Sequence, residues 1–323
     1  MLNKPIIIVC GEPNSIFSEI LIKTLKIYKN KKPIVLIGSV KLLHSQFEKL
    51  KLKQNLNLVV FKDKKFIGIK KNELNIINVN YNFQKPFEKI SKKSNKYIFN
   101  CFENALEILK NSNSSGLING PISKKNFLGK KHQGITEFLK KKFKNNDKYA
   151  MLIYNKKLSV CPITTHIPIR KIYSKISKNK IVVKCLLISD FFKKKFKRKP
   201  KIAITGLNPH CENFVSVSEE KKIIEPSIKK LINKGVKISG PFPADTVFLK
   251  QNIKRFDIVI GMYHDQVLAP AKALFNFNAI NITLGLPFLR ISPDHGPNYK
   301  MIGKNKSNPE SLLKAIKFLD NNK

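Results

Sequence analysis

The stretch FDIVIGMYHDQVLAPAKAL, residues 256–274, begins as a short apolar run rich in β-branched residues, which is typical of a buried strand. His264, Asp265 and Lys272 follow this run closely. In open α/β sheets, ligands bind beyond the carboxyl ends of the strands, so polar residues in this place indicate a site at a sheet edge. Such a sheet requires further strands of the same kind elsewhere in the chain.

Short apolar runs do recur along the chain, and they alternate with amphipathic segments. The expected strands lie at 5–10, 33–38, 56–61, 115–120, 149–154, 158–165, 201–207, 256–262 and 279–285. The expected helices lie at 16–28, 97–110, 180–196, 218–234 and 309–320. This alternation predicts the α/β fold class, with a largely parallel sheet wrapped by helices. Segment 62–95 lacks this alternation of apolar runs and amphipathic segments, and it is expected to be a hairpin or a mobile loop.

The composition indicates a globular protein that is not attached to a membrane. Hydrophobic residues make up 42% of the 323 residues, which suffices for a substantial core. Every apolar run is shorter than the roughly 18–20 residues that span a bilayer, and the N-terminal run is too short for a signal peptide. The five cysteines form no C-x-x-C pair, which favours buried thiols in a reducing compartment. We therefore expect a cytoplasmic protein.

The formal net charge of +41 raises the question of a nucleic-acid partner. Only four of the 62 basic residues are arginine, whereas surfaces that grip phosphates usually use arginine forks. Lysine is spread along the whole chain together with Asn, Ile and Phe, as expected from a bias toward A- and T-rich codons. We expect weak adhesion to polyanions but no specific nucleic-acid partner.

Three of the six histidines share one position relative to the expected strands. His166 ends CPITTH, His210 ends IAITGLNPH and His264 ends IVIGMYH. If these strand ends converge, the imidazoles could surround one divalent cation and leave positions open for a substrate. The alternative is that each histidine is bonded separately to the backbone. The shared position of all three favours the metal site.

Charged residues near other strand ends suit an anionic ligand. Arg170 and Arg290 are two of only four arginines, and arginine suits bidentate capture of carboxylate or phosphate. With Lys272 they could hold a doubly or triply charged substrate, although Arg170 alone also fits a surface ion pair. The segment GPFPADTVF (240–248) adds Asp245. Neither G-x-G-x-x-G nor G-x-x-x-x-G-K-[ST] occurs, so a standard Rossmann dinucleotide site or P-loop is unsupported.

Taken in order, the motifs of the chain resemble those of a known enzyme family. They are GEP, NGPISK, GITEF, TTHIPIR, GLNPH, GPFPADTVF, MYHDQ and NITLGLPFLRISPDHG. The series resembles the 4-hydroxythreonine-4-phosphate dehydrogenase family of pyridoxal 5′-phosphate (vitamin B6) biosynthesis, from Gly11 to about Leu312.

The resemblance implies the architecture of isocitrate and isopropylmalate dehydrogenases, with two α/β/α subdomains and a cleft between them. We expect residues 1–130 with 286–323 to form the first subdomain. Residues 131–285 are expected to form the second, carrying the metal site and the dimer contacts. The resemblance also implies a homodimer with a shared active site.

The implied reaction is an oxidative decarboxylation. NAD or NADP takes a hydride from C3 of 4-phosphohydroxy-L-threonine, and the keto acid then loses CO₂ to give 3-amino-2-oxopropyl phosphate. The alternative substrate is a phosphorylated threonate or erythronate. Two other classes remain: a nonenzymatic polyanion-binding protein, supported by charge alone, and phosphotransacetylase-like acyl transfer, in which the strand-end histidines would have no use.

The family's functional residues carry over to this chain by motif. His166, His210 and His264 are expected to be ligands of a divalent metal, which could be zinc, magnesium or cobalt. The expected substrate contacts are Thr136, Lys272, Asn281 and Arg290. Asp245 and Lys272 are the expected catalytic residues, with Asp245 a metal neighbour or proton acceptor and Asp265 a group that orients His264. The expected cofactor contacts are Asp294, His295, Gly296 and Lys300.

Three positions depart from the family pattern. Ile135 stands where the family has a histidine that contacts the substrate, which leaves the exact substrate open. NSIFSE (14–19) lacks the glycines of the family's A-G-I-G-P-E. Lys300 replaces an aspartate that, in related isopropylmalate dehydrogenases, meets the adenosine ribose. A cation there predicts weaker preference for NAD and admission of NADP, unless Lys300 simply points to solvent.

Overall fold

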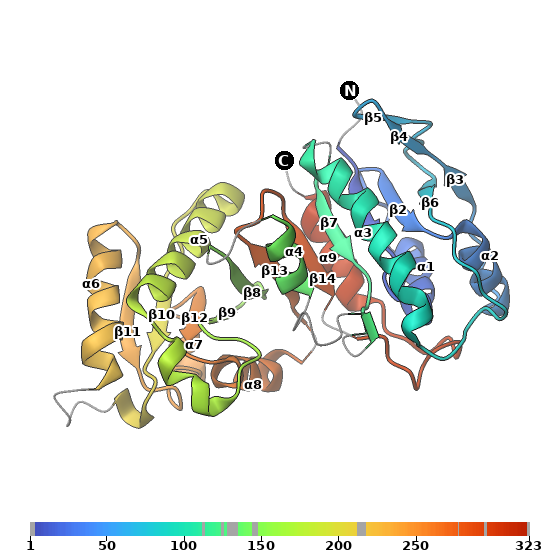
Figure 1. The fold of residues 1–323 in the computed structure, drawn as a ribbon. Coiled ribbons are helices and arrows are strands. Elements are labelled where there is room, and N and C mark those ends of the chain that lie inside the picture. The colour runs from blue at the N-terminus through green and yellow to red at the C-terminus, as the bar shows by residue number, and fades with distance from the viewer. Residues whose placement is uncertain are drawn as a thin grey trace. The chain divides into compact units, whose positions relative to one another are not determined.

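The computed structural model describes residues 4–111, 114–123, 126–127, 135–143, 148–211, 218–276, 278–293 and 296–321, with the backbone alone at 136, 137, 140 and 141. The chain divides into two compact units (Figure 1). Unit 1 comprises Met1–Leu139 and Pro287–Lys323, and unit 2 comprises Lys140–Leu286. Helices and strands alternate in both units, which confirms the predicted α/β fold class.

Unit 1 is built on a parallel sheet. Its strands are, in spatial order, β14 (Arg290–Pro293), β7 (Gly116–Asn119), β1 (Ile6–Val9), β2 (Ile34–Gly38), β6 (Leu74–Asn78) and β3 (Leu56–Leu58). All four residues of β1 are fully buried, although successive side chains point to opposite faces. Both faces are therefore covered, which explains why β1 reads as a continuous apolar run without alternation.

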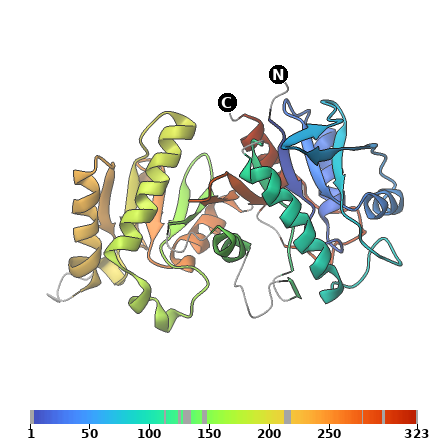
Figure 2. The same ribbon diagram turned by 45° about the horizontal axis from the view of Figure 1, so that its top comes forward.

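Helices cover this sheet through their apolar stripes. They are α1 (Phe17–Ile27), α2 (Val40–Lys49), α3 (Asn95–Lys110), α9 (Glu310–Asp320) and the first part of α4 (Ile135–Lys142). α3 packs against β1, β2 and β7, while α9 packs against β14, β7 and β1 (Figure 2). The segment expected as a hairpin or loop contributes β5 (Lys65–Ile67), which pairs antiparallel with β4 (Val60–Lys62), and also the buried strand β6.

Unit 2 has a mixed sheet. Its strands are, in spatial order, β11 (Ile238–Phe242), β10 (Ile202–Thr205), β12 (Ile258–Gly261), β9 (Ser159–Pro162), β8 (Ala150–Tyr154) and β13 (Ile280–Leu284). The first four run parallel to one another, and β8 runs antiparallel to both β9 and β13. The parallel strands thus present their carboxyl ends at one edge of the sheet.

The helices of unit 2 are α5 (Lys178–Phe196), α6 (Glu225–Asn233), α7 (Lys250–Ile253) and α8 (His264–Phe275). The expected helix at 218–234 is divided, because a π-helical turn at Glu220–Ile224 precedes α6 and Pro226 lies in the first turn of α6. α8 packs against β9 and β12 (Figure 1). Val267 and Ala271 of α8 join the apolar core of the unit. No helix in the described part of the chain combines the length and apolar composition that a membrane crossing requires.

Candidate metal and substrate site

The strand ends that carry the three predicted histidine ligands are neighbours in unit 2. β10, β12 and β9 lie side by side and parallel, so their carboxyl ends share one edge of the sheet. His210 follows β10, His264 follows β12 and His166 follows β9, each within a few residues. This edge is the candidate site.

Two of these histidines lie close together. The ring centroids of His166 and His264 are 5.6 Å apart, and the ring planes are tilted by 38°. This spacing is compatible with two imidazoles on one ion, since zinc–nitrogen bonds are about 2.0–2.1 Å long. His264 Nδ1 lies 2.7 Å from Asp265 Oδ1. The carboxylate therefore favours a proton on Nδ1 and leaves Nε2 as the free ligand nitrogen.

His166 and His210 adopt backbone conformations that L-residues rarely use. Their φ angles are 47° and 53°, in the left-handed region. A residue with a side chain pays roughly 1–2 kcal/mol for this conformation, although histidine is among the residues that enter it more often. Conformations of this kind gather at functional sites, where the surrounding structure holds them. Two of the three predicted metal ligands, His166 and His210, therefore have a positive φ angle.

The structure does not gather all three histidines into one cluster. Among the described residues, no group of three or more His, Cys, Asp or Glu side chains lies close enough to hold a metal ion. His210 is exposed in the short turn Pro209–Cys211, which follows β10. The pair formed by His166 and His264 is thus the part of the predicted ligand set that is brought together.

A glutamine side chain connects these strand ends, and only its place in the motif MYHDQ could have indicated it from the sequence. Gln266 Oε1 accepts hydrogen bonds from the Met262 amide over 2.6 Å and from the Thr205 hydroxyl over 2.9 Å. Gln266 Nε2 donates to the Gly206 carbonyl over 2.8 Å. On the other side, the Thr164 hydroxyl donates to the Met262 carbonyl over 2.7 Å. The ends of β9, β12 and β10 are therefore tied together.

A buried carboxylate fixes the backbone just before His210. Glu220 Oε1 accepts from the amides of Leu207 and Asn208 over 2.7 and 2.9 Å. The Asn208 amide side chain donates to Glu220 Oε2 over 2.9 Å and to Glu219 Oε2 over 2.7 Å. Burial acts to raise the pKa of Glu220, but the hydrogen bonds from Asn208 and Leu207 outweigh it and lower that pKa. Glu220 therefore holds this loop as an anion.

The predicted substrate residues occupy different environments. In unit 2, Asp245 is exposed in the turn after β11, and Lys272 is half-buried in the last turn of α8. Asn281 lies in β13, and its Oδ1 is buried without a hydrogen-bond partner among the described residues. In unit 1, Arg290 begins β14, is 3% exposed and donates from Nε to Asn119 Oδ1 over 2.8 Å. Buried Arg290 thus holds the end of β7, where the motif NGPISK begins.

The remaining predicted residues are only partly described. Thr136 lies in α4, where its backbone alone is described, and Ile135 at the start of that helix is 7% exposed. Asp294 and His295 lie outside the described residues. Gly296 and Lys300 follow β14 and are exposed.

Unit 1 also carries a buried acid in the motif GEP. Glu12 is 1% exposed, and its carboxylate accepts from the Ser94 hydroxyl over 3.1 Å and from the Asn14 amide over 3.3 Å. Burial raises the pKa of Glu12 to about 7, against the two hydrogen bonds that lower it. The loop is tight because Gly11 and Gly120 meet: a Cβ on Gly120 would lie 2.2 Å from the Cys10 carbonyl oxygen. Glycine is therefore required there.

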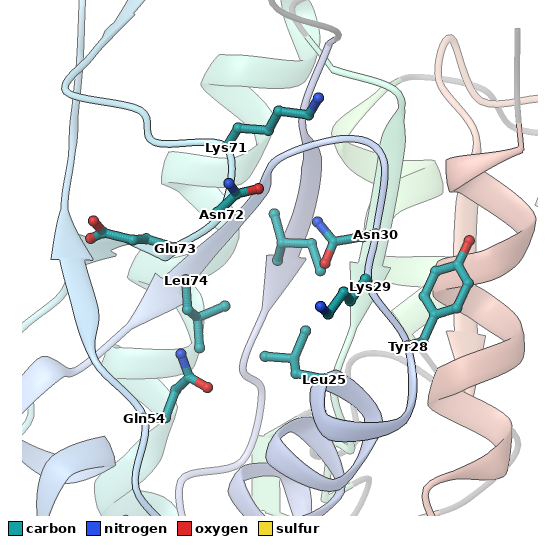
Figure 3. Close-up of a pocket in the computed structure, with 10 residues that line it drawn as sticks. Leu25, Tyr28, Lys29, Asn30, Gln54, Lys71, Asn72, Glu73 and Leu74 are labelled. Carbon is teal, nitrogen blue, oxygen red and sulfur yellow. The ribbon is translucent and has the colours of Figure 1, made fainter.

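Unit 1 also contains a cavity of about 450 Å³. It opens before the amino ends of β2 and β6, the edge opposite to the one where ligands bind in sheets of this type. Leu25, Leu74 and Lys71 are among the residues that line it (Figure 3). It contains none of the predicted site residues.

The fold of two α/β units is shared with solved structures of low sequence identity. A β-decarboxylating dehydrogenase from Thermococcus kodakarensis has the same fold, with a TM-score of 0.55 at 12% identity, over 99% of this chain and 82% of that one. The family model of the pyridoxal phosphate biosynthetic protein PdxA matches residues 29–319. The chain belongs to the PdxA family.

Individual relatives agree with this assignment. A 4-hydroxythreonine-4-phosphate dehydrogenase from Sulfurihydrogenibium sp. is 40% identical over 96% of each chain. A D-threonate 4-phosphate dehydrogenase from Salmonella typhimurium is 31% identical over 98% of each chain. The crystal structure of 4-hydroxythreonine-4-phosphate dehydrogenase from Klebsiella pneumoniae superposes with a TM-score of 0.82 at 28% identity, over 98% of each chain. The chain is therefore similar to oxidoreductases over nearly its whole length.

Proposed function

We propose that this chain oxidises 4-phosphohydroxy-L-threonine at C3 with NAD or NADP and releases CO₂, giving 3-amino-2-oxopropyl phosphate for pyridoxal 5′-phosphate biosynthesis. The observation that carries the proposal is the close pair of His166 and His264 at parallel strand ends, in a chain of the PdxA family. We propose a cytoplasmic homodimer with a shared active site, as the resemblance implies.

The donor set fits a divalent metal ion. His166, His210 and His264 would hold it, and imidazole nitrogen suits zinc and cobalt better than magnesium. When bound, such an ion lowers the pKa of a coordinated hydroxyl and stabilises developing negative charge on that oxygen. Asp265 orients His264 through the 2.7 Å contact to Nδ1, so that Nε2 is available for coordination.

Charged side chains would bind and orient the substrate. Lys272 and Arg290 are cations that match a phosphate and a carboxylate, and arginine adds a bidentate geometry. The buried Asn281 Oδ1, which has no partner among the described residues, suits a substrate hydroxyl or ammonium donor. Thr136 would add a further contact. Asp245 would accept the proton of the substrate hydroxyl, with assistance from Lys272.

The cofactor would bind along the segment after β14. We assign Asp294, His295, Gly296 and Lys300 to this role by their motif. The exposed ammonium of Lys300 favours a 2′-phosphate over a bare ribose, which supports the use of NADP beside NAD.

Two observations favour a second substrate. Ile135 is buried where the family has a histidine that contacts the substrate, and a relative named D-threonate 4-phosphate dehydrogenase aligns along nearly the whole chain. A phosphorylated threonate or erythronate is therefore the second candidate. The difference lies at C2, where 4-phosphohydroxy-L-threonine carries an ammonium group and threonate a hydroxyl.

The test is an assay of NADH or NADPH formation with each substrate, with and without a chelator. We expect turnover of 4-phosphohydroxy-L-threonine that EDTA abolishes and that added Zn²⁺ or Co²⁺ restores. Turnover that EDTA leaves unchanged would contradict the metal assignment. A higher kcat/KM for D-threonate 4-phosphate would select the second candidate.

A further inference from the structure

We propose that Gln266 is a positioning residue that links the strand ends carrying His210 and His264 and so sets the separation of these two predicted metal ligands. The proposal rests on the function proposed above. It concerns a side chain that would touch neither metal nor substrate and would act only through the two histidine-bearing segments.

The backbone ladder between the two strands stops before the site. The parallel pairing of β10 with β12 extends as far as Ile204 opposite Ile260. Beyond that pair, Thr205, Gly206 and Met262 continue toward the histidines without pairing between β10 and β12. The segments that follow β10 and β12 need another link to keep their separation, because buried backbone groups at the end of a strand pairing require partners.

Gln266 supplies this link from the first turn of α8. Its Oε1 accepts from Met262 N and Thr205 Oγ1, and its Nε2 donates to Gly206 O, over distances of 2.6–2.9 Å. One planar amide therefore bonds to the ends of both strands. Since Gln266 lies two residues after His264 on the same helix, the same bonds fix the start of α8 and with it His264.

The chemistry of the position requires a glutamine. Two donors and one acceptor face the side chain, so it must accept twice and donate once. An ionised glutamate accepts but cannot donate, and it would place an anion against the Gly206 carbonyl. A methionine has a similar length and volume but makes none of the three bonds. A neutral amide, unlike an ionised carboxylate or a thioether, satisfies all three partners together.

The experiment measures Co²⁺ binding by competition with a chelator, together with the visible absorption spectrum of the cobalt-loaded protein. The variants are Gln266→Met, Thr205→Val and Thr205→Ser, the last of which keeps the hydroxyl that bonds to Gln266. The control is Asn155→Leu, which removes another amide of unit 2. Asn155 lies in the turn between β8 and β9, where it bonds to Lys157 N and Asn278 O, and it precedes the amino end of β9, opposite to the end that leads to His166.

We expect Gln266→Met to weaken Co²⁺ binding about 10-fold or more and to change the spectrum, as loss of an outer-shell partner does. Thr205→Val should weaken binding by a smaller factor, and Thr205→Ser should restore it. Asn155→Leu should lower the unfolding midpoint yet keep wild-type Co²⁺ affinity. A folded Gln266→Met protein with wild-type affinity and spectrum would overturn the proposal.

Two further outcomes are distinguishable. If Gln266→Met does not fold, Thr205→Val decides, and wild-type Co²⁺ affinity in that variant overturns the proposal. If the wild-type protein binds Co²⁺ with the same affinity and spectrum as His264→Ala, the histidine site itself is wrong. In that case the proposed function fails, and the role of Gln266 fails with it.

Discussion

The imidazole rings of His166 and His264 stand 5.6 Å apart, although they follow different strands of the sheet. The parallel pairing of β9 with β12 brings them together, since it aligns Pro162 with Gly261 at the ends of both strands. A parallel sheet thus converts a repeated sequence pattern, in which a histidine follows an apolar run, into a pair of neighbouring ligands.

The contact between His264 and Asp265 predicts an effect on metal affinity. Asp265→Asn should weaken binding of Zn²⁺ or Co²⁺ about 10-fold, because the anion no longer orients the ring or raises its basicity. Chelator competition would measure the affinity. Asp190→Asn is the matched control, since Asp190 is an exposed carboxylate on α5 whose contact is with Lys193 at 4.0 Å. Equal affinities for the Asp265 variant and the wild type would remove Asp265 from the site.

The exposed Lys300 predicts the cofactor preference. Lys300→Asp should raise the ratio of kcat/KM for NAD to that for NADP by about 10-fold, because a carboxylate favours the ribose hydroxyls and repels a 2′-phosphate. Steady-state kinetics with both cofactors would measure the ratio. A strong preference for NAD that is the same in the wild type and the variant would show that Lys300 only faces solvent.

Buried Glu12 predicts a loss of stability as the pH rises. Its pKa is raised from 4.5 to about 7, so the folded state prefers the protonated acid. The associated stability is fully present below pH 4.5 and is lost as the pH rises through 7. The difference amounts to up to about 3 kcal/mol, at 1.36 kcal/mol per pKa unit.

The variant Glu12→Gln checks this effect. The wild type should lose stability between pH 5 and pH 8, whereas Glu12→Gln lacks this loss. The free energy of unfolding of Glu12→Gln minus that of the wild type should therefore increase over this range. Urea unfolding at several pH values would measure it. Parallel pH profiles for the two proteins would contradict a raised pKa for Glu12.

Glu220 predicts a pH effect of the opposite sign. Its pKa is lowered, so its contribution to stability is present above the unfolded-state pKa and is lost as the pH falls through the folded-state value. Glu220→Gln should cost about 1–3 kcal/mol at pH 7, because the anion is lost and an amide nitrogen would face the Asn208 side-chain donor in place of Oε2. The cost should shrink below pH 4.5. Urea unfolding at pH 7 and pH 4 would measure both, and a cost independent of pH would contradict an anionic Glu220.

The core strands could be predicted from the sequence because their composition is uniform. IVIG forms β12 and IIIV forms β1. Both could be recognised because strands buried on both faces are continuously apolar. β11 could not be found in this way. It contains Gly240 and Pro241, which ordinarily argue against a strand, but it lies at the edge of the sheet, where proline is tolerated.

Parts of the candidate site also could not be predicted from the sequence. α8 begins at His264 and contains Pro270, so its helical pattern is interrupted. The roles of Gln266 and Glu220 depend on hydrogen bonds to backbone groups, and a backbone partner leaves no residue pattern to detect. The histidines were detectable because each one follows a recognisable strand.

Anomalous diffraction at the zinc edge, from crystals of the zinc-loaded protein, tests the shared metal site most directly. We expect one anomalous peak with nitrogen atoms of His166, His210 and His264 at about 2.0–2.1 Å, whether from one subunit or two. A zinc ion bound elsewhere, or one that leaves His210 outside its coordination sphere, would contradict it.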